Sequence, residues 1–481
     1  MLEFISVFVY GLVAFLLPIA MVVTLAAALH WGQRRENGLM PYLFYPVLLI
    51  VAVTILLSGR NLYLMSDLAL VVTVKHPIAS WISRLTSVIM LVVAGERILR
   101  RFFILVPSEN ALKPLVFAFC FYCFTNVFTS ALLAEHTSFS HDYFYMAIAG
   151  GAVLFASKRD GDVAIISARN ALFCLLVLSA LCILVKPELV LSRDYQGYIP
   201  GLRYRYAGLS NHANAFGPLV VVFLMCLWIQ PFKRAWLTNF SWMLGAFSLL
   251  LAQSKTSWIA FILCFICLAY FGHREFLKQR LFDFRRPNFL IGILLLLMVV
   301  AMALFILIMF GSVGDKLNSY LVSRAGNDLV SMTGRNQIWD VAIQEWKKYP
   351  IFGYGLTIWN DDFRAQIGLP AAFHAHNQFF QTLASAGLVG VGGLITYAVM
   401  LFRYTLKTAE SSKGLSVALF VMIFIRSISE VPLAMNSFGP EQMVHLLMLM
   451  VIVANIKRES PILKMNTAPL HTSLTPVRSF N

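Results

Sequence analysis

Long apolar blocks recur along the chain, and most of them reach the length that a bilayer-spanning helix needs. A hydrocarbon core about 30 Å thick takes roughly 17–25 residues of helix, and a lone strand could not satisfy its backbone groups in lipid. The pattern predicts about 12–13 spans, at residues 4–29, 41–57, 79–96, 112–131, 143–157, 169–186, 211–230, 238–253, 257–272, 288–311, 377–402, 415–430 and 441–456. The fifth, eighth and ninth are short, so we expect them to be tilted, broken or buried in the bundle.

Composition points to the same class of protein. Of 481 residues, 59% are hydrophobic and 13% charged, whereas soluble chains average about 45–50% and about 25%. We therefore predict an all-α, polytopic transmembrane helical bundle in which residues 1–457 form one integral membrane domain, without an internal repeat. The apolar N-terminus lacks a basic region and a cleavage site, so we expect a retained helix there. The polar segment 458–481 is expected to be a disordered cytoplasmic tail.

Lysine and arginine concentrate in every second loop, which sets the expected orientation. Basic loops stay on the cytoplasmic side, so the N-terminus is predicted outside and the C-terminus inside the bacterial inner membrane. The net charge of +15 then reflects topology and contact with anionic membrane lipids, and nucleic acid is not an expected partner. The outward loops lie near 58–78, 132–142, 187–210, 312–376 and 431–440.

All seven cysteines lie inside apolar blocks. Two pairs, Cys120/Cys123 and Cys264/Cys267, have the spacing of metal or redox motifs. Small residues on buried helix faces explain them better, and we expect no disulfide framework.

The outward loop 312–376 is too long to be a simple connector. Thr333 is a plausible N-cap for a helix in it, and Pro350 would end that helix. Apolar residues recur there on one face at helical spacing, at Ile338, Trp339, Ala342, Ile343 and Trp346. We expect this amphipathic helix to lie along the membrane surface.

Two groups of polar residues stand at outward helix starts in the middle of the chain. Arg203, Arg205, Asn211 and His212 precede the span at 211–230, against the positive-inside bias. Their simpler interpretation is a positively charged helix entrance. Lys255 lies in a polar junction between two spans, where an ionisable residue indicates function. The alternative is a lysine that snorkels to the interface.

Two more groups flank the long loop. Gly334 and Arg335 begin its helix, where free N–H groups and a guanidinium favour phosphate, unless Arg335 is only an exposed surface residue. His374, His376 and Asn377 precede the next span. No cysteine or carboxylate flanks the histidines at ligand spacing, so we expect no metal. A neutral histidine would accept a proton, a cationic one would hold phosphate, and a lone loop histidine is usually structural.

Together, the outward loops offer cations and histidines and few acids. This suits an anionic substrate, for which a lipid-linked diphosphate is the obvious candidate at an outer leaflet. Small residues from Ala384 to Gly393 should let the following helix pack closely and hold the histidines firmly.

Several of these segments resemble the shared signature of O-antigen ligases and related polysaccharide polymerases. The resemblance covers roughly residues 200–405 and rests on RYAGLSNHANAFG, QSKTSW, GRNQIWDVAIQEWKKYPIFGYGL and HAHNQFFQTLASAGLVG. It implies transfer of a glycan from undecaprenyl diphosphate to an acceptor sugar, without metal, cofactor or nucleotide sugar. The family's periplasmic arginines and histidine would fall on Arg335 and His376, with Arg205 or Arg203. The family usually has arginine where this chain has Lys255. Lysine keeps the positive charge but lacks the planar, forked guanidinium group of arginine.

The resemblance leaves the acceptor open. A second lipid-linked repeat unit would make the protein a polymerase, and lipid A–core would make it a ligase; we lean slightly to polymerase. Arg205, Lys255 and Arg335 would hold the diphosphate, and His376, supported by His374, would deprotonate or orient the acceptor in an inverting displacement. A glycan transporter or flippase is the alternative from another class, although inverted repeats are absent.

Overall fold

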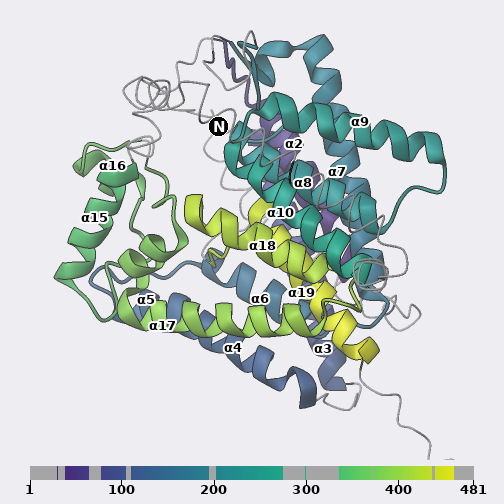
Figure 1. Cartoon of the computed structure of the whole chain (residues 1–481). Coiled ribbons are helices and arrows are strands. Elements are labelled where there is room, and N and C mark those ends of the chain that lie inside the picture. The colour runs from purple at the N-terminus through teal and green to yellow at the C-terminus, as the bar shows by residue number, and fades with distance from the viewer. Residues whose placement is uncertain are drawn as a thin grey trace, which may run out of the picture.

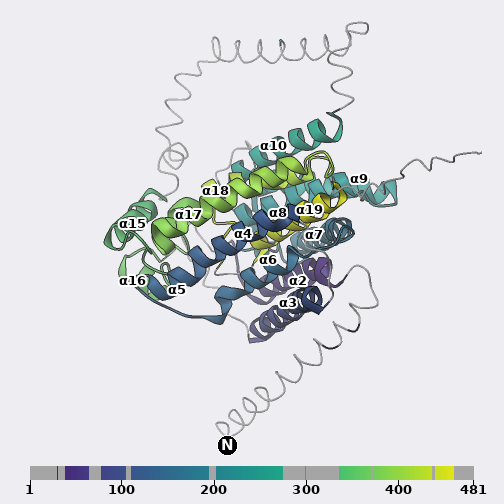
Figure 2. The same ribbon diagram turned by 90° about the horizontal axis from the view of Figure 1, so that it is seen from below.

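The structure is a computed structural model, and most of the residues it describes are helical, with very few in strands (Figures 1 and 2). It describes residues 26, 30, 38–63, 77–103, 110–193, 195, 202–274, 298, 335–370, 372–435 and 439–459. The predicted spans 4–29 and 288–311, and the tail beyond 459, therefore lie outside the described residues apart from isolated positions. A single pair of two-residue strands, Leu191–Ser192 (β1) and Arg205–Tyr206 (β2), is antiparallel within the described chain.

The described helices confirm an all-α protein with several membrane-spanning segments. Seven helical segments are long and apolar enough to cross a membrane. They contain α2 (Phe44–Leu57) with the turn before it, α3 (Pro77–Phe103), the run from α4 (Lys113–Cys123) through the π-helical turn η3 (Phe124–Phe128) to α5 (Thr129–Leu133), α7 (Asp160–Val185), α9 (Ala235–Ala252), α10 (Lys255–Gly272) and α17 (Gln378–Lys407). Three shorter apolar helices are α8 (Ala213–Ile229), α18 (Leu415–Ser429) and the apolar part of α19 (Pro440–Glu459).

Two predicted spans differ clearly from the helices found. The span expected at 143–157 is α6 (Tyr145–Val153), whose nine residues cover only about 14 Å at 1.5 Å per residue. It packs among α3, α4 and α19, and its shielded position removes the need to match the full lipid thickness. In addition, α7 begins at Asp160 rather than near 169. The buried Asp160 carboxylate pairs there with Arg97 at 2.8 Å, which lets a charged turn enter the bundle.

Contacts between connecting segments fall into two sets, at opposite ends of the bundle. At one end, the backbone around Glu135 and His136 bonds to Gly353 and Tyr354. This end also holds the helices of the long loop, α15 (Arg335–Lys348) and α16 (Asp361–Gln366), beside the start of α17 (Figures 1 and 2). At the other end, Arg274 pairs with Glu410. These contacts place described parts of two predicted outward loops at one end and of two basic loops at the other; the side of the membrane that each end faces stays a prediction.

The long helix α17 is interrupted near its first third. Gly387 has φ 61° and ψ −159°, outside helical geometry. The backbone N–H groups of Leu388 and Val389 donate to the carbonyls of Pro350 and Ile351, at 2.9 and 3.1 Å. The end of the long loop therefore satisfies a helix break that would be costly in lipid. A side chain at Gly387 would collide with this backbone, since its Cβ would lie 2.4 Å from the Ile351 carbonyl oxygen.

Beyond the break, glycines let α17 approach the π-helical turn η3. A Cβ on Gly390 or Gly393 would crowd Asn126 or Thr125. The Asn126 amide donates to the Gly390 carbonyl at 3.0 Å. The close packing predicted for this small-residue stretch is present, and it anchors the half of α17 that follows the site.

Candidate active site

The entrance of α8 brings the first predicted group together. His212 is its N-cap, and the His212 Nδ1 accepts the Asn214 backbone N–H at 3.1 Å. The Arg205 Nη2 donates to the Asn214 side-chain oxygen at 2.7 Å. Arg203 and Asn211 are exposed at the same entrance. Since its Nδ1 is an acceptor, His212 is neutral and carries its proton on Nε2.

The polar junction between α9 and α10 lies against this entrance. Gln253 ends α9 in a left-handed conformation, φ 46°, and its amide donates to the Tyr204 carbonyl at 2.8 Å. The Arg205 Nε donates to the Ala252 carbonyl at 3.4 Å. Lys255, the half-buried first residue of α10, follows directly. The first two groups predicted from the sequence therefore adjoin.

Residue 375, between the two histidines, is held from both sides. The Ala375 N–H donates to the Gln381 side-chain oxygen at 2.9 Å, and the Ala375 carbonyl accepts the Trp339 indole N–H at 2.9 Å. The Trp339 ring also stacks on Phe380, with centroids 5.0 Å apart. Because Trp339 belongs to α15 and Phe380 to α17, this clamp fixes the Arg335 helix relative to the histidines. Gly334 lies outside the described residues.

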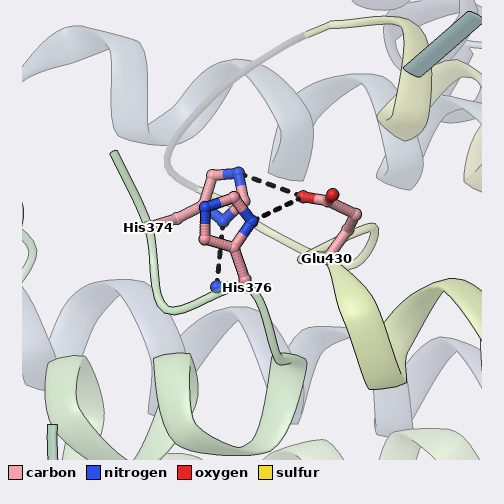
Figure 3. A group of neighbouring side chains, drawn as sticks. All are labelled: His374, His376 and Glu430. Atoms are coloured by element: carbon pink, nitrogen blue, oxygen red, sulfur yellow. Dashed lines mark hydrogen bonds and ion pairs between the residues drawn. The ribbon is translucent and has the colours of Figure 1, made fainter. Parts of the chain in front are cut away.

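His374 and His376 converge on one buried carboxylate, Glu430, at the end of α18 (Figure 3). The His374 Nε2 and the His376 Nδ1 each lie 3.3 Å from the Glu430 Oε2. The His374 Nδ1 accepts the His376 backbone N–H at 3.1 Å, so His374 is the neutral tautomer that donates through Nε2. Asn377 caps α17 by accepting the N–H groups of Phe379 and Phe380.

His376 is oriented differently from His374. With Nδ1 donating to Glu430, its Nε2 keeps a lone pair, and nothing in the described part of the chain bonds to that atom. Its backbone is left-handed, φ 49°, an uncommon conformation for a residue with a side chain. Such strain persists where surrounding contacts hold it, and it accumulates at functional sites.

Two arginines face the same carboxylate. Arg335 Nη2 lies 3.9 Å from Glu430 Oε1, and Arg426 Nη1 lies 4.0 Å from it. Arg426 also pairs with Glu441 and donates to the Asn214 carbonyl at 3.0 Å. Arg426 therefore links the α8 entrance to the histidine cluster, and one continuous polar network runs from Arg205 to Arg335.

The charges in this network set the protonation of the cluster. Burial by itself would raise the pKa of the Glu430 carboxyl, but the His376 hydrogen bond and the Arg426 charge lower it to about 2. Partial burial, followed by the neighbouring His376, lowers the pKa of His374 to about 4. Near neutral pH, Glu430 is therefore an anion and His374 a neutral donor, in agreement with the hydrogen-bond pattern.

Sequence reasoning missed Glu430 and Arg426. It noted that no carboxylate flanks the histidines along the sequence, whereas Glu430 follows His376 by 54 positions and reaches it only through the fold. A signal was present: Arg426 and Glu430 stand four residues apart at an outward helix end, where ionisable groups indicate function.

The corrected cluster has ligand types that could hold a metal ion. The ligand atoms of His374, His376 and Glu430 all lie within 4.8 Å of one another. Against this use, Glu430 already faces Arg335 and Arg426, whose charges would repel a cation. The arrangement matches a carboxylate that orients an imidazole, leaving the far nitrogen to accept a proton.

Comparison with known proteins places part of the site within a described family segment. Residues 239–395 match the family model described as O-Antigen ligase. This segment contains Lys255, Arg335 and both histidines, and it ends before Arg426 and Glu430. A search of curated proteins gave no match. The family match supports an assignment to the O-antigen ligase family, which confirms the resemblance seen in the sequence and implies an enzyme of glycosyl transfer acting on lipid-linked glycan and acceptor substrates in general.

Proposed function

We propose that this chain, which carries an O-antigen ligase segment, transfers a glycan from undecaprenyl diphosphate to an acceptor sugar hydroxyl. The reaction would take place on the periplasmic face of the bacterial inner membrane, during assembly of a surface polysaccharide. One observation carries the proposal: His376 is held by Glu430 through Nδ1, beside Arg335, with Nε2 left to act as a base.

The proposed step is a single displacement. The acceptor hydroxyl oxygen attacks the anomeric carbon, the bond from that carbon to the diphosphate oxygen breaks, and His376 Nε2 takes the hydroxyl proton. Undecaprenyl diphosphate leaves with the bonding electron pair, and in-line attack inverts the anomeric centre. A positioned general base contributes about 10²–10⁴-fold. No metal or cofactor takes part in this scheme.

The cations would bind the diphosphate and stabilise its charge as it leaves. Arg335 suits this role because its approach to Glu430, at 3.9 Å, is longer than a normal hydrogen bond, so the guanidinium can turn toward phosphate. Arg205 and Lys255 supply positive charge at the neighbouring entrance, where Arg203, Asn211 and His212 are exposed. Asn377 supports His376 by capping the helix that follows it.

As the acceptor we favour a second lipid-linked repeat unit slightly over lipid A–core. The neighbouring genes bear on this choice. Genes for a flippase and for repeat-unit glycosyltransferases beside this one would favour the polymerase over the ligase. The polar groups gather at one end of the bundle, as expected of a transferase on one leaflet rather than a transporter.

Replacing His376 by alanine tests the proposal against a flippase. The variant should stop chain extension or attachment while single lipid-linked units accumulate on the periplasmic leaflet, because their passage across the membrane does not need the base. Labelling of outer-leaflet glycan in intact spheroplasts measures this distribution. His141→Ala is the matched control, since His141 is exposed at the same end and contacts Asp142 and the Tyr145 ring rather than the histidine cluster. Units retained on the cytoplasmic leaflet would favour the transporter.

A further inference from the structure

Arg60 is a buried arginine outside both the family segment and every group predicted from the sequence. It follows α2, and 6% of its surface is exposed. Its Nε donates to the Leu189 carbonyl at 2.7 Å. The remaining donors reach a turn before α8, at the carbonyls of Ser210 (2.6 Å), Asn211 (3.1 Å) and Gly208 (2.7 Å).

These bonds join three chain segments at the site end of the bundle. The loop after α2 meets the segment near Leu189 and the turn 208–211, and two backbone bonds reinforce the junction. The turn is tight: Gly208 has φ 53°, and a Cβ there would lie 2.4 Å from the Phe216 ring. The turn ends in Asn211 and in His212, the N-cap of α8.

Among the described residues, no acid balances the charge of Arg60. None of the ion pairs among the described residues involves Arg60, and its bonds are all to neutral carbonyls or a hydroxyl. Burial lowers the pKa of Arg60 to about 10, which still leaves it charged at neutral pH. Burying an unpaired charge is costly, and fold stability alone would be served as well by neutral residues. A nearby anionic ligand would make the charge favourable.

We propose that Arg60 is a positioning residue for the diphosphate of the lipid-linked donor. Its planar fork holds the turn 208–211 so that Arg205, Asn211 and His212 present their polar groups together, and its charge adds to the positive potential there. The inference rests on the proposed function, and it makes the first third of the chain a part of the donor site.

Binding of undecaprenyl diphosphate to the purified full-length protein provides the test, because it requires no knowledge of the sugars. In Arg60→Lys the positive charge is kept, but a single ammonium group cannot donate to all four carbonyls that the guanidinium group binds. We expect its dissociation constant for the lipid to rise about tenfold, with the thermal unfolding temperature close to wild type. Faster hydrogen exchange should be confined to residues 204–214.

The matched control is Arg193→Lys. Arg193 is an exposed arginine of the same loops, and its guanidinium lies over the Tyr63 ring at 3.7 Å. This variant should bind the lipid as the wild type does. In Arg60→Ala, millimolar guanidinium should restore binding, because the carbonyl cradle for the fork remains.

Each other outcome has a defined meaning. Arg60→Lys that is folded and binds the lipid with wild-type affinity overturns the inference and leaves the proposed function intact. Loss of the folded protein in both Arg60 variants would make Arg60 a folding residue, which also overturns it. A wild-type protein that fails to bind undecaprenyl diphosphate would instead contradict the proposed function itself.

Discussion

Glu430→Gln isolates the charge of the carboxylate on which the site is centred. Glutamine keeps the size of the side chain and one oxygen acceptor. Both imidazoles bond to the same oxygen, Oε2, so the glutamine oxygen can replace it for both, but the two bonds at 3.3 Å lose their charge assistance. The Glu430 side chain is only 12% exposed, so water screens the loss weakly.

The structure sets the expected size of the effect. Each of the two bonds changes from one to a charged group, worth about 1.5–3 kcal/mol, to a neutral one, worth about 0.5–1.5 kcal/mol. Together the change is about 2 kcal/mol, which is roughly one to two decades in rate. Protein level in the membrane should be near normal, since Arg426 keeps Glu441 as a partner. Transfer of lipid-linked units in membrane vesicles, measured against pH, is the assay.

The pH dependence of the two titrating partners bears on the expected result. The pKa values of Glu430 and His374, about 2 and about 4, lie below the assay range, so Glu430 stays charged and His374 neutral throughout it. The Glu430 charge raises the pKa of His374, so removing it lowers that pKa further and His374 stays neutral. The maximal rate should therefore fall at every pH of the assay.

Glu345→Gln is the control, because Glu345 is a buried carboxylate of α15 that bonds to Lys348. It should leave the rate within about twofold, as exposed or half-exposed pairs contribute about 0–1 kcal/mol. A Glu430→Gln protein with the wild-type rate across the assayed pH range would refute the role assigned to Glu430.

Three further predictions follow from topology, anion binding and metal content. A reporter fused near Asn360 should be periplasmic and one near Lys413 cytoplasmic; a cytoplasmic result at Asn360 would separate the site from its substrate. Arg335→Ala should abolish transfer at near-normal protein level, with a loss of about 1.5–3 kcal/mol for each charge-assisted bond, and Arg335→Lys should rescue poorly; wild-type transfer in the alanine variant would make Arg335 a surface residue. Transfer by purified protein should persist in EDTA, whereas activity lost to chelator and restored by a divalent ion would make His374, His376 and Glu430 metal ligands.

The sequence by itself determined the class of structure and the residues that carry charge at the site. Apolar length is a local property, so it predicted the helices, and the positions of lysine and arginine predict an orientation that the reporter fusions will test. The helix at Arg335–Lys348 followed from its periodicity in the same way. The HAHN segment stood out because histidines and a capping residue are adjacent in the chain.

Tertiary structure decided which polar groups meet. Glu430 reaches the histidines across 54 positions, and Arg60 reaches Ser210 across 150; spacing along a chain carries no signal for such contacts. The break at Gly387 also depends on a distant partner, the carbonyls of Pro350 and Ile351. Without that partner, the same residues would form an unbroken helix, since backbone groups in lipid must otherwise bond within their own segment. The chemistry of the site therefore arises from packing between helices that the sequence specifies one at a time.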